Sequence, residues 1–263
     1  MLFSGKSLRT WLIVGIGMVI TITPVYAKDV LDIQLTATSD YVFRGITQTQ
    51  NKGAAQAGFD YRHSAGPYLG LWTSYVDIET LYGDVDAEAD IYGGYAGDIE
   101  SINMGWDLGY ILYRYNETRP RYEEAYFALS FDLVPERLSA TAMASYDSEG
   151  DHMVVEGVVR LDVGKGFWIK AQPGEFDDRT KVGTDYKYLK TSIGKRFEFT
   201  NASIKSLDIE LAYSDTNLER GDIISYGFLR DDKIIIPNNT NSINRDNEDY
   251  VQNIWWLAIT GHF

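Results

Sequence analysis

The chain has 263 residues, no cysteine and a formal net charge of −14. This length suits a single domain, the lack of cysteine excludes a disulfide framework, and the acidic balance argues against nucleic acid as a partner. Aromatic residues make up 14% of the chain, with 19 Tyr and 6 Trp. Such a content is typical of proteins that meet a boundary between apolar and aqueous surroundings.

Residues 1–27 have the three-part pattern of a secretory signal peptide. Lys6 and Arg9 form a short positive region, residues 11–22 are apolar, and small residues lead up to Ala27. The apolar run is too short for a helix that must cross about 30 Å of hydrocarbon. We therefore expect residues 1–27 to be removed on export and residues 28–263 to form the mature domain. An uncleaved membrane anchor is the alternative.

No apolar run after Ala27 approaches the roughly 20 residues of a spanning helix. The only other structure that satisfies every backbone polar group inside a bilayer is a closed β-barrel. If the mature chain enters a membrane, we therefore expect it to do so with strands.

Apolar and polar residues alternate with a period of two along most of the mature chain, as in β-strands with two different faces. The alternation is clearest at residues 102–112. The expected strands, in chain order, are 31–43, 54–63, 68–77, 87–95, 102–112, 124–132, 138–146, 155–163, 167–172, 186–197, 207–214 and 250–263.

The last expected strand keeps its apolar face up to the final residue. Trp255, Leu257, Ile259 and Phe263 lie on that face. Bacterial outer-membrane barrels are known to end on such an aromatic residue, so these four residues are candidates for membrane anchoring and for recognition by the barrel-assembly machinery. The other expected partners are outer-membrane lipid, lipopolysaccharide and small solutes.

The number of expected strands is even, and most have roughly the length that a tilted spanning strand needs. Short turns mostly alternate with longer polar connections, as between the two sides of an outer membrane, which would place both termini in the periplasm. We therefore expect an all-β fold, a transmembrane antiparallel up-and-down β-barrel of about twelve strands, in the outer membrane of a Gram-negative cell. A secreted β-sandwich explains the alternation equally well, but not its combination with the signal peptide and the terminal Phe263.

Five segments along the expected strands carry a further signal. They are Ser39-Asp40-Tyr41-Val42-Phe43-Arg44-Gly45-Ile46-Thr47-Gln48, Gln56-Ala57-Gly58-Phe59-Asp60-Tyr61, residues 70–77, Asp90-Ile91-Tyr92-Gly93-Gly94-Tyr95 and Glu124-Ala125-Tyr126. With these segments the chain resembles the TorF-type family of bacterial porins. The resemblance implies an outer-membrane barrel with porin activity. It implies no catalytic residue and no particular solute.

The polar faces of the strands would line the interior of such a barrel. The candidate pore-lining residues are Asp40, Arg44, Asp60, Arg62, Glu88, Asp90, Asp107, Glu124, Glu156, Arg160 and Glu210. Carboxylates outnumber cations, so we expect a weak preference for cations. The alternative is that these groups pair and neutralise a packed interior. For Asp40, Arg44 and Arg62 in particular we expect a structural ion-pair network.

Residues 215–249 form the longest expected connection, longer than the last loop of the TorF-type family. Two apolar runs flank a charged turn in this segment, which predicts a hairpin. The hairpin would either fold into the mouth of the barrel or extend its wall, and connections of this length are often functional.

These features favour a porin for passive diffusion of small hydrophilic solutes. One alternative is a substrate-specific channel for nucleosides or small sugars, because aromatic residues such as Tyr92, Tyr126 and Trp256 fall on the interior side. A plugged structural or adhesion barrel is another alternative, since side chains can fill a barrel of this size.

An outer-membrane lipid hydrolase is the least favoured alternative. His152 lies close in sequence to Asp147, Glu149 and Asp151, but its simplest interpretation is a solvated loop histidine. Neither a Gly-x-Ser-x-Gly elbow nor a His-Glu-x-x-His helix motif occurs in the sequence. We therefore expect no enzyme activity, no catalytic residue, no cofactor and no metal.

Overall fold

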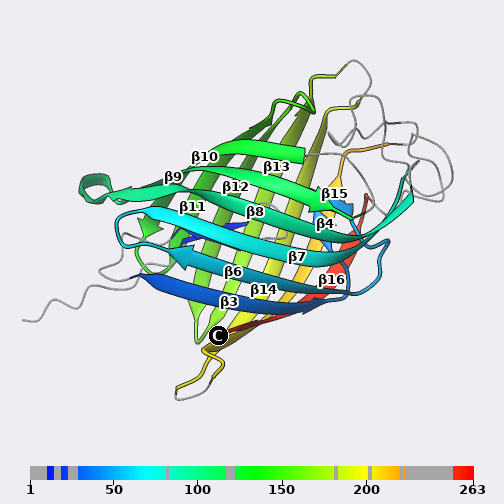
Figure 1. Cartoon of the computed structure of the whole chain (residues 1–263). Coiled ribbons are helices and arrows are strands. Elements are labelled where there is room, and N and C mark those ends of the chain that lie inside the picture. The colour runs from blue at the N-terminus through cyan, green and yellow to red at the C-terminus, as the bar shows by residue number, and fades with distance from the viewer. Residues whose placement is uncertain are drawn as a thin grey trace, which may run out of the picture.

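Twelve antiparallel strands close into one barrel in the computed structural model, which describes residues 11–14, 19–22, 29–80, 83–116, 122–180, 183–200, 203–219, 222 and 251–263. The barrel strands are β3 (Val30–Thr38), β6 (Ala54–Arg62), β7 (Pro67–Thr80), β8 (Gly83–Ile99), β9 (Met104–Tyr115), β10 (Tyr122–Val134), β11 (Leu138–Asp147), β12 (His152–Gly164), β13 (Phe167–Asp178), β14 (Tyr186–Glu198), β15 (Ser206–Thr216) and β16 (Ile254–His262). Each barrel strand pairs with the next one along the chain, and β16 pairs with β3 to close the ring (Figure 1).

The remaining described elements are short. β1 (Trp11–Val14) pairs with β2 (Val19–Ile22), and both fall within the predicted signal peptide, most of which lies outside the described residues. β4 (Val42–Phe43) pairs with β5 (Ile46–Thr47) in a small hairpin between β3 and β6. A single 3₁₀ turn, η1 (Glu100–Ile102), joins β8 to β9. No helix in the described residues is long and apolar enough to cross a membrane.

The expected fold class and strand number are confirmed, but several strand ends differ from the prediction, two of them by five residues or more. The first strand was expected to run to Phe43, whereas β3 ends at Thr38 and the chain then turns inward. The ninth strand was expected to end at Gln172 and to be followed by a charged loop from Pro173, yet β13 continues to Asp178. The β12–β13 register skips from Glu156↔Gly174 to Val159↔Ala171, so the ladder on that side is interrupted beside the proline.

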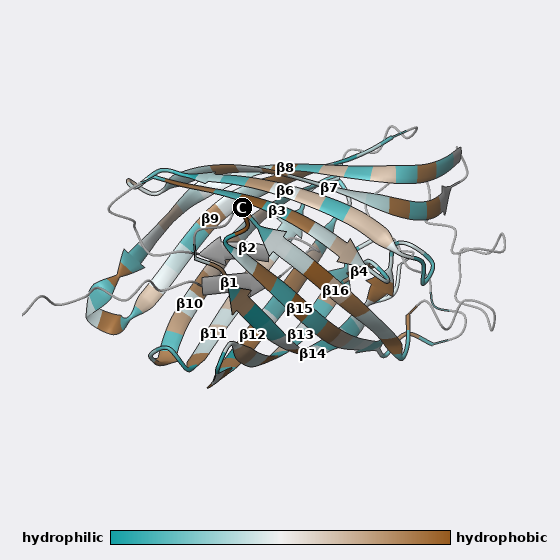
Figure 2. Cartoon of the chain, turned by 90° about the horizontal axis from the view of Figure 1, so that it is seen from below, coloured by the Kyte–Doolittle hydropathy of each residue, from teal (hydrophilic) through white to brown (hydrophobic). Residues whose placement is uncertain are grey.

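The outer face of the barrel is apolar. Along β3 and β16, outward residues such as Leu31, Leu35, Trp255 and Leu257 are exposed, and Trp255 reaches 64%. Figure 2 shows the alternation of polar and apolar residues along the strands. The polar and charged residues at the alternate positions of the strands point inward. In a water-soluble protein, charged residues lie mostly on the outside and apolar residues inside. A ring of exposed apolar side chains on a closed sheet is the surface that hydrocarbon requires.

Inward-facing glycines make room for aromatic rings on the neighbouring strand. Gly70 is directly opposite Tyr92, and Gly174 is opposite Tyr188. A Cβ atom on either glycine would overlap the opposite ring. Tyr92 is held in this place because its hydroxyl donates to Asp60 Oδ1 at 2.5 Å. Covering an inner glycine with a ring from the next strand packs the two strands closely without a void.

The substitution Gly70→Ala is expected to destabilise the barrel by about 1–3 kcal/mol, because the added methyl group displaces the Tyr92 ring from its hydrogen bond. Urea unfolding of the refolded protein in detergent micelles measures this change. The matched control is Gly157→Ala, where the nearest atom to the new Cβ is Pro173 Cγ at 3.7 Å. Equal stability of the two variants would contradict the packing argument.

Candidate functional site: the barrel interior

A loop folds into the barrel between β3 and β6. This segment, residues 39–53, is called the inner loop below, and nearly all of its residues from Asp40 to Thr49 are buried. Its backbone is tied to itself by Gln48 N–H donating to Tyr41 O at 2.7 Å. It is tied to the wall by Asp77 N–H donating to Gln48 O, also at 2.7 Å. The inner loop is therefore a built part of the interior.

Asp40 organises the base of the inner loop. Its Oδ1 atom accepts hydrogen bonds from the hydroxyls of Thr47 and Thr49, the latter at 2.7 Å. Burial raises the pKa of the Asp40 carboxyl above its ordinary value, and the two threonine hydroxyls partly counteract this rise. Asp40 thus holds the two ends of the β4–β5 hairpin together.

The tip of the β4–β5 hairpin is a two-residue turn formed by Arg44 and Gly45. Both have positive φ, at 47° and 85°, as a tight hairpin of this length requires. Glycine is also required for space, because a Cβ at position 45 would overlap Thr216 and come within 2.9 Å of Tyr188 Cβ. The turn projects the Arg44 side chain across the interior.

Arg44 reaches the opposite wall and forms a bidentate ion pair with Glu124 of β10. The Nη1–Oε1 distance is 2.6 Å and the Nη2–Oε2 distance is 2.7 Å, with both side chains almost fully buried. Arg44 also donates to Tyr122 Oη at 2.8 Å and to Ser145 Oγ at 3.3 Å. Burial alone would lower the pKa of the guanidinium, but the Glu124 carboxylate and the neighbouring tyrosines raise it well above its ordinary value. The planar guanidinium of arginine can make two parallel hydrogen bonds to a carboxylate, whereas the ammonium group of lysine cannot.

His152 belongs to the same cluster, so its interpretation as a solvated loop residue was wrong. Its side chain is 1% exposed, and its Nε2 atom lies 2.7 Å from Tyr122 Oη and 3.4 Å from a Glu124 oxygen. The imidazole is stacked between the rings of Tyr122 and Phe176. The burial of His152 was hard to predict from the sequence, because His152 directly follows an acidic turn and is itself the first residue of β12.

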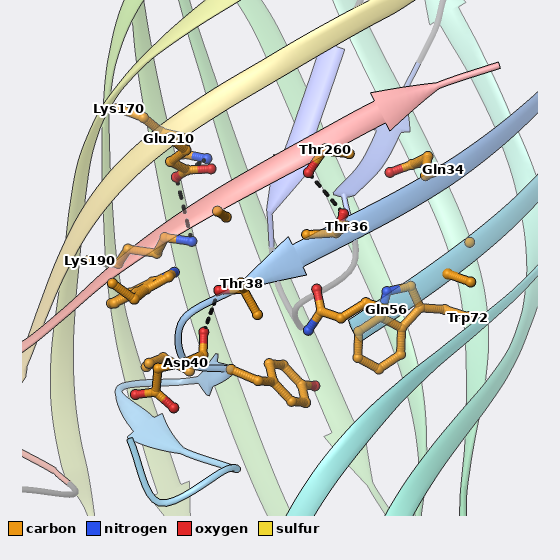
Figure 3. A pocket seen from close by; sticks show the side chains of 16 residues that line it. Gln34, Thr36, Thr38, Asp40, Gln56, Trp72, Lys170, Lys190, Glu210 and Thr260 are labelled. Atoms are coloured by element: carbon orange, nitrogen blue, oxygen red, sulfur yellow. Dashed lines mark hydrogen bonds and ion pairs between the residues drawn. The ribbon is translucent and has the colours of Figure 1, made fainter. Parts of the chain in front are cut away.

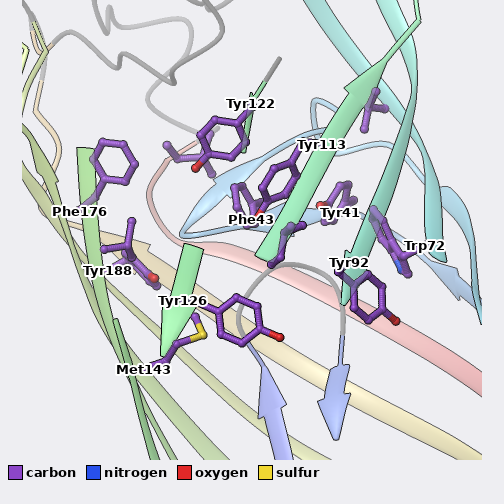
Figure 4. Close-up of a cluster of buried hydrophobic side chains, with 14 of the residues drawn as sticks. Tyr41, Phe43, Trp72, Tyr92, Tyr113, Tyr122, Tyr126, Met143, Phe176 and Tyr188 are labelled. Carbon is purple, nitrogen blue, oxygen red and sulfur yellow. The ribbon is translucent and has the colours of Figure 1, made fainter. Parts of the chain in front are cut away.

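Aromatic side chains fill the interior around the inner loop. Phe43 and Tyr41 of the loop meet Tyr113, Tyr122 and residues of the far wall in one buried cluster (Figure 4). The cluster continues through Phe176, Tyr186 and Tyr188, and it includes Leu218 and Val251 from the ends of the longest connection. The part of the interior at the level of the inner loop is therefore packed with side chains.

The expected network of Asp40, Arg44 and Arg62 does not form. Arg44 pairs with Glu124, and Asp40 accepts from threonines instead. The Arg62 guanidinium lies over the Tyr68 ring, 5.2 Å from its centroid. The prediction failed because it treated residues 40–44 as a continuation of the first strand, whereas these residues leave the wall after Thr38.

The other candidate pore-lining residues all lie on the inner face, and they divide into two sectors. Carboxylates dominate one wall, with Asp60 on β6, Glu88 and Asp90 on β8, Asp107 on β9 and Glu124 on β10. The strands β12 to β15 carry Glu156, Arg160 and Glu210 together with Lys170, Lys190 and Arg196. On this second wall the cations pair with acids, as in Arg196–Asp208 at 2.5 Å and Lys170–Glu210 at 3.1 Å.

A cavity of about 80 Å³ lies beside the inner loop, against the β3–β16 seam. Figure 3 shows its lining, which comes from the loop, from β3, β6 and β7 on one side and from β13 to β16 on the other. The lining includes Trp72, Trp256, Gln34, Gln56, Thr36, Thr260, Lys170, Lys190 and Glu210. The period-two pattern predicts inner positions, but it does not show which residues of distant strands meet in one cavity.

The four residues expected to anchor the last strand lie near or on the outside. Trp255, Leu257 and Ile259 are exposed on the outer face. The terminal Phe263 is half-buried, with its N–H donating to Ile33 O at 3.0 Å and its carbonyl accepting from Lys205 Nζ at 2.6 Å. The predicted hairpin within residues 215–249 falls almost entirely outside the described residues.

Among the described residues, no group of three or more His, Asp or Glu side chains is arranged to hold a metal ion.

The closed sheet, its apolar outer face and its charged interior define a β-barrel with the fold of outer-membrane porins. The chain resembles the solved KdgM porin, with a TM-score of 0.56 at 7% identity, covering 88% of this chain and 99% of the other. It also resembles the KdgM porin in complex with disordered oligogalacturonate, with a TM-score of 0.54 at 7% identity, covering 89% of this chain and 98% of the other. Residues 29–230 match the family described as bacterial protein of unknown function (Gcw_chp), and the chain belongs to this family. No curated protein matches the chain.

Arg44→Ala is expected to destabilise the folded barrel by about 3–5 kcal/mol, because it leaves the Glu124 carboxylate buried without its counter-charge. Urea unfolding in micelles tests this effect. Arg44→Lys should recover only part of the loss, since an ammonium cannot make the bidentate pair.

The control for the Arg44 experiment is the double variant Arg44→Met with Glu124→Gln. Removing both charges should restore most of the stability lost in Arg44→Ala. If Arg44→Ala unfolds at the wild-type urea concentration, the ion pair does not hold the inner loop in place.

Proposed function

We propose that this protein is an outer-membrane channel for passive diffusion of small hydrophilic solutes. The observation that carries the proposal is a closed barrel whose outside is apolar and whose inside is lined with charged and hydrogen-bonding side chains. A barrel spans a bilayer without unpaired backbone groups, and a polar interior is the feature that solute passage needs. The fold shared with the KdgM porin supports this function, and so does the resemblance to TorF-type porins.

The proposed orientation of the protein in the outer membrane follows from the signal peptide and from the two ends of the barrel. Residues 1–27 would direct export and be removed, and the short turns at residues 63–66, 135–137 and 165–166 would face the periplasm. The terminal strand β16, ending at Phe263, would be recognised by the barrel-assembly machinery. The opposite end would contact lipopolysaccharide.

The inner loop is the proposed constriction of this channel. It crosses the interior and packs against strands on the far wall, so the width of the path depends on its position. The acidic wall of β6 to β10 lies along the same interior, and its carboxylates carry the proposed weak preference for cations.

A plugged structural barrel is the second candidate function. The observation that favours it is the buried aromatic packing around the Arg44–Glu124 pair, which fills the interior at the level of the inner loop. The enzyme alternative has less support, because His152 is buried between two rings and a lipid ester has no access to it. We propose no catalytic role.

Single-channel recording in a planar bilayer under a salt gradient separates a channel from a plugged barrel. We expect the mature chain to give discrete open steps with a cation-selective reversal potential. Replacing residues 41–50 by a short Gly-Ser linker should raise the conductance several-fold, because the linker removes the constriction. The same experiment with residues 148–150 replaced by Gly-Ser-Gly is the control and should leave the conductance unchanged.

Either of two outcomes would contradict part of the proposal. Steps without charge selectivity would refute the role of the acidic wall. Folded wild-type protein that gives no steps, while the linker variant conducts, would favour the plugged barrel.

A further inference from the structure

The cavity at the β3–β16 seam is partly open to the rest of the barrel interior. Its volume of about 80 Å³ is roughly half of the about 150 Å³ that accommodates a benzene ring, so a sugar ring would enter the cavity in part and extend into the open interior. Its roof is formed by Asp40, Tyr41 and Val42 of the inner loop, and its floor and sides are strand residues (Figure 3). The cavity therefore exists only because the inner loop folds inward.

The charges that line the cavity balance. Lys170 and Lys190 both point to Glu210, with Nζ–Oε1 distances of 3.1 Å and 3.7 Å. The remaining charged lining residue is Asp40, which already accepts hydrogen bonds from Thr47 and Thr49. Two cations and two acids leave no net formal charge, so the lining has no excess charge that would attract an anion or a cation.

Two indole rings border the cavity from opposite sides of the seam. Trp72 comes from β7 and Trp256 from β16, and both are buried. Trp72 is held by Tyr41 at a ring-centroid distance of 5.3 Å, and the Lys190 ammonium lies 4.9 Å from the centroid of Trp256. Fixed rings of this kind give a small solute an apolar surface to lie against.

The rest of the lining consists of neutral groups that both donate and accept hydrogen bonds. Gln34 and Gln56 contribute carboxamides, each with one donor contact to the wall at 3.3 Å. Thr36 and Thr260 contribute hydroxyls that lie 2.8 Å apart across the seam. A solute hydroxyl needs such dual partners, since it also donates and accepts.

We propose that this cavity binds part of a neutral polyhydroxylated solute such as a single sugar ring. The balanced charges, the two tryptophans and the carboxamide and hydroxyl groups together match a molecule with apolar C–H faces and hydroxyl edges. The claim that the cavity selects solutes on their way through the barrel rests on the proposed channel function. The claim that the cavity binds such a solute rests on the geometry of the cavity alone.

Isothermal titration calorimetry on the mature protein, refolded in a detergent without a sugar head group, tests the assignment. The neutral probe is D-glucose, and the charged matched probes are glucuronate and glucosamine. We expect saturable binding of glucose and binding at least about tenfold weaker for both charged probes. Tighter binding of glucuronate, or no binding of glucose, would overturn the proposal.

Two neighbouring tryptophans supply matched variants. Trp256→Ala removes an inner ring and should weaken glucose binding by about tenfold, whereas Trp255→Ala removes an outward ring and should not change it. Retention of the folded form on unheated gels checks that both variants are intact. Equal affinities in the two variants would refute the role of the cavity.

The titration does not depend on conduction, so the two proposals fail separately. If glucose binds but no channel is recorded, the cavity assignment stands and the channel function fails. If steps are recorded but glucose does not bind, the channel stands and the cavity assignment fails.

Discussion

The pairing of the last strand with the first is the constraint on which the other features of this barrel depend. In hydrocarbon, every unpaired backbone N–H or C=O group is costly, so a sheet is stable there only when it has no edge. The pairs from Thr38↔Ala258 to Gln34↔His262 remove that edge. Closure in turn gives the sheet an inside and an outside, and period-two alternation then sends Leu35 and Leu257 outward and Thr36 and Trp256 inward.

At the level of the inner loop, the inward side chains of the strands do not fill this barrel by themselves. The inner loop supplies the missing material and has to satisfy the polar groups that it brings with it. The two terminal nitrogens of Arg44 do so through Glu124, Tyr122 and Ser145, and the Oδ1 atom of Asp40 does so through Thr47 and Thr49. Where strands themselves carry large rings, glycines such as Gly70 accept them from the next strand.

The walls of the barrel were predictable from the sequence because they depend on local alternation, which even located the inward carboxylates from Asp60 to Glu210. The inner loop was not predictable, because Tyr41 and Phe43 continue the apolar alternation of β3 after the chain has left the sheet. Long-range contacts could not be predicted from the sequence either. Arg44 and Glu124 are 80 residues apart, and only the register of the whole ring of strands brings them together. For the same reason, neither strand alone predicts that Trp72 and Trp256 line the same cavity.

The position of the inner loop in the chain has a consequence for assembly. The loop follows directly after β3, and the other edge of β3 is the seam that stays open until β16, the final strand, arrives. The segment that fills the interior therefore lies near the start of the barrel sequence, whereas the strand that closes the barrel lies at its end. Its apolar residues Tyr41, Phe43 and Ile46 find most of their burial only once the ring is complete. Closure of the seam and formation of the interior core are thereby coupled, so the wall and the core form one cooperative unit. A barrel that has not closed would expose these apolar side chains and would be prone to aggregate.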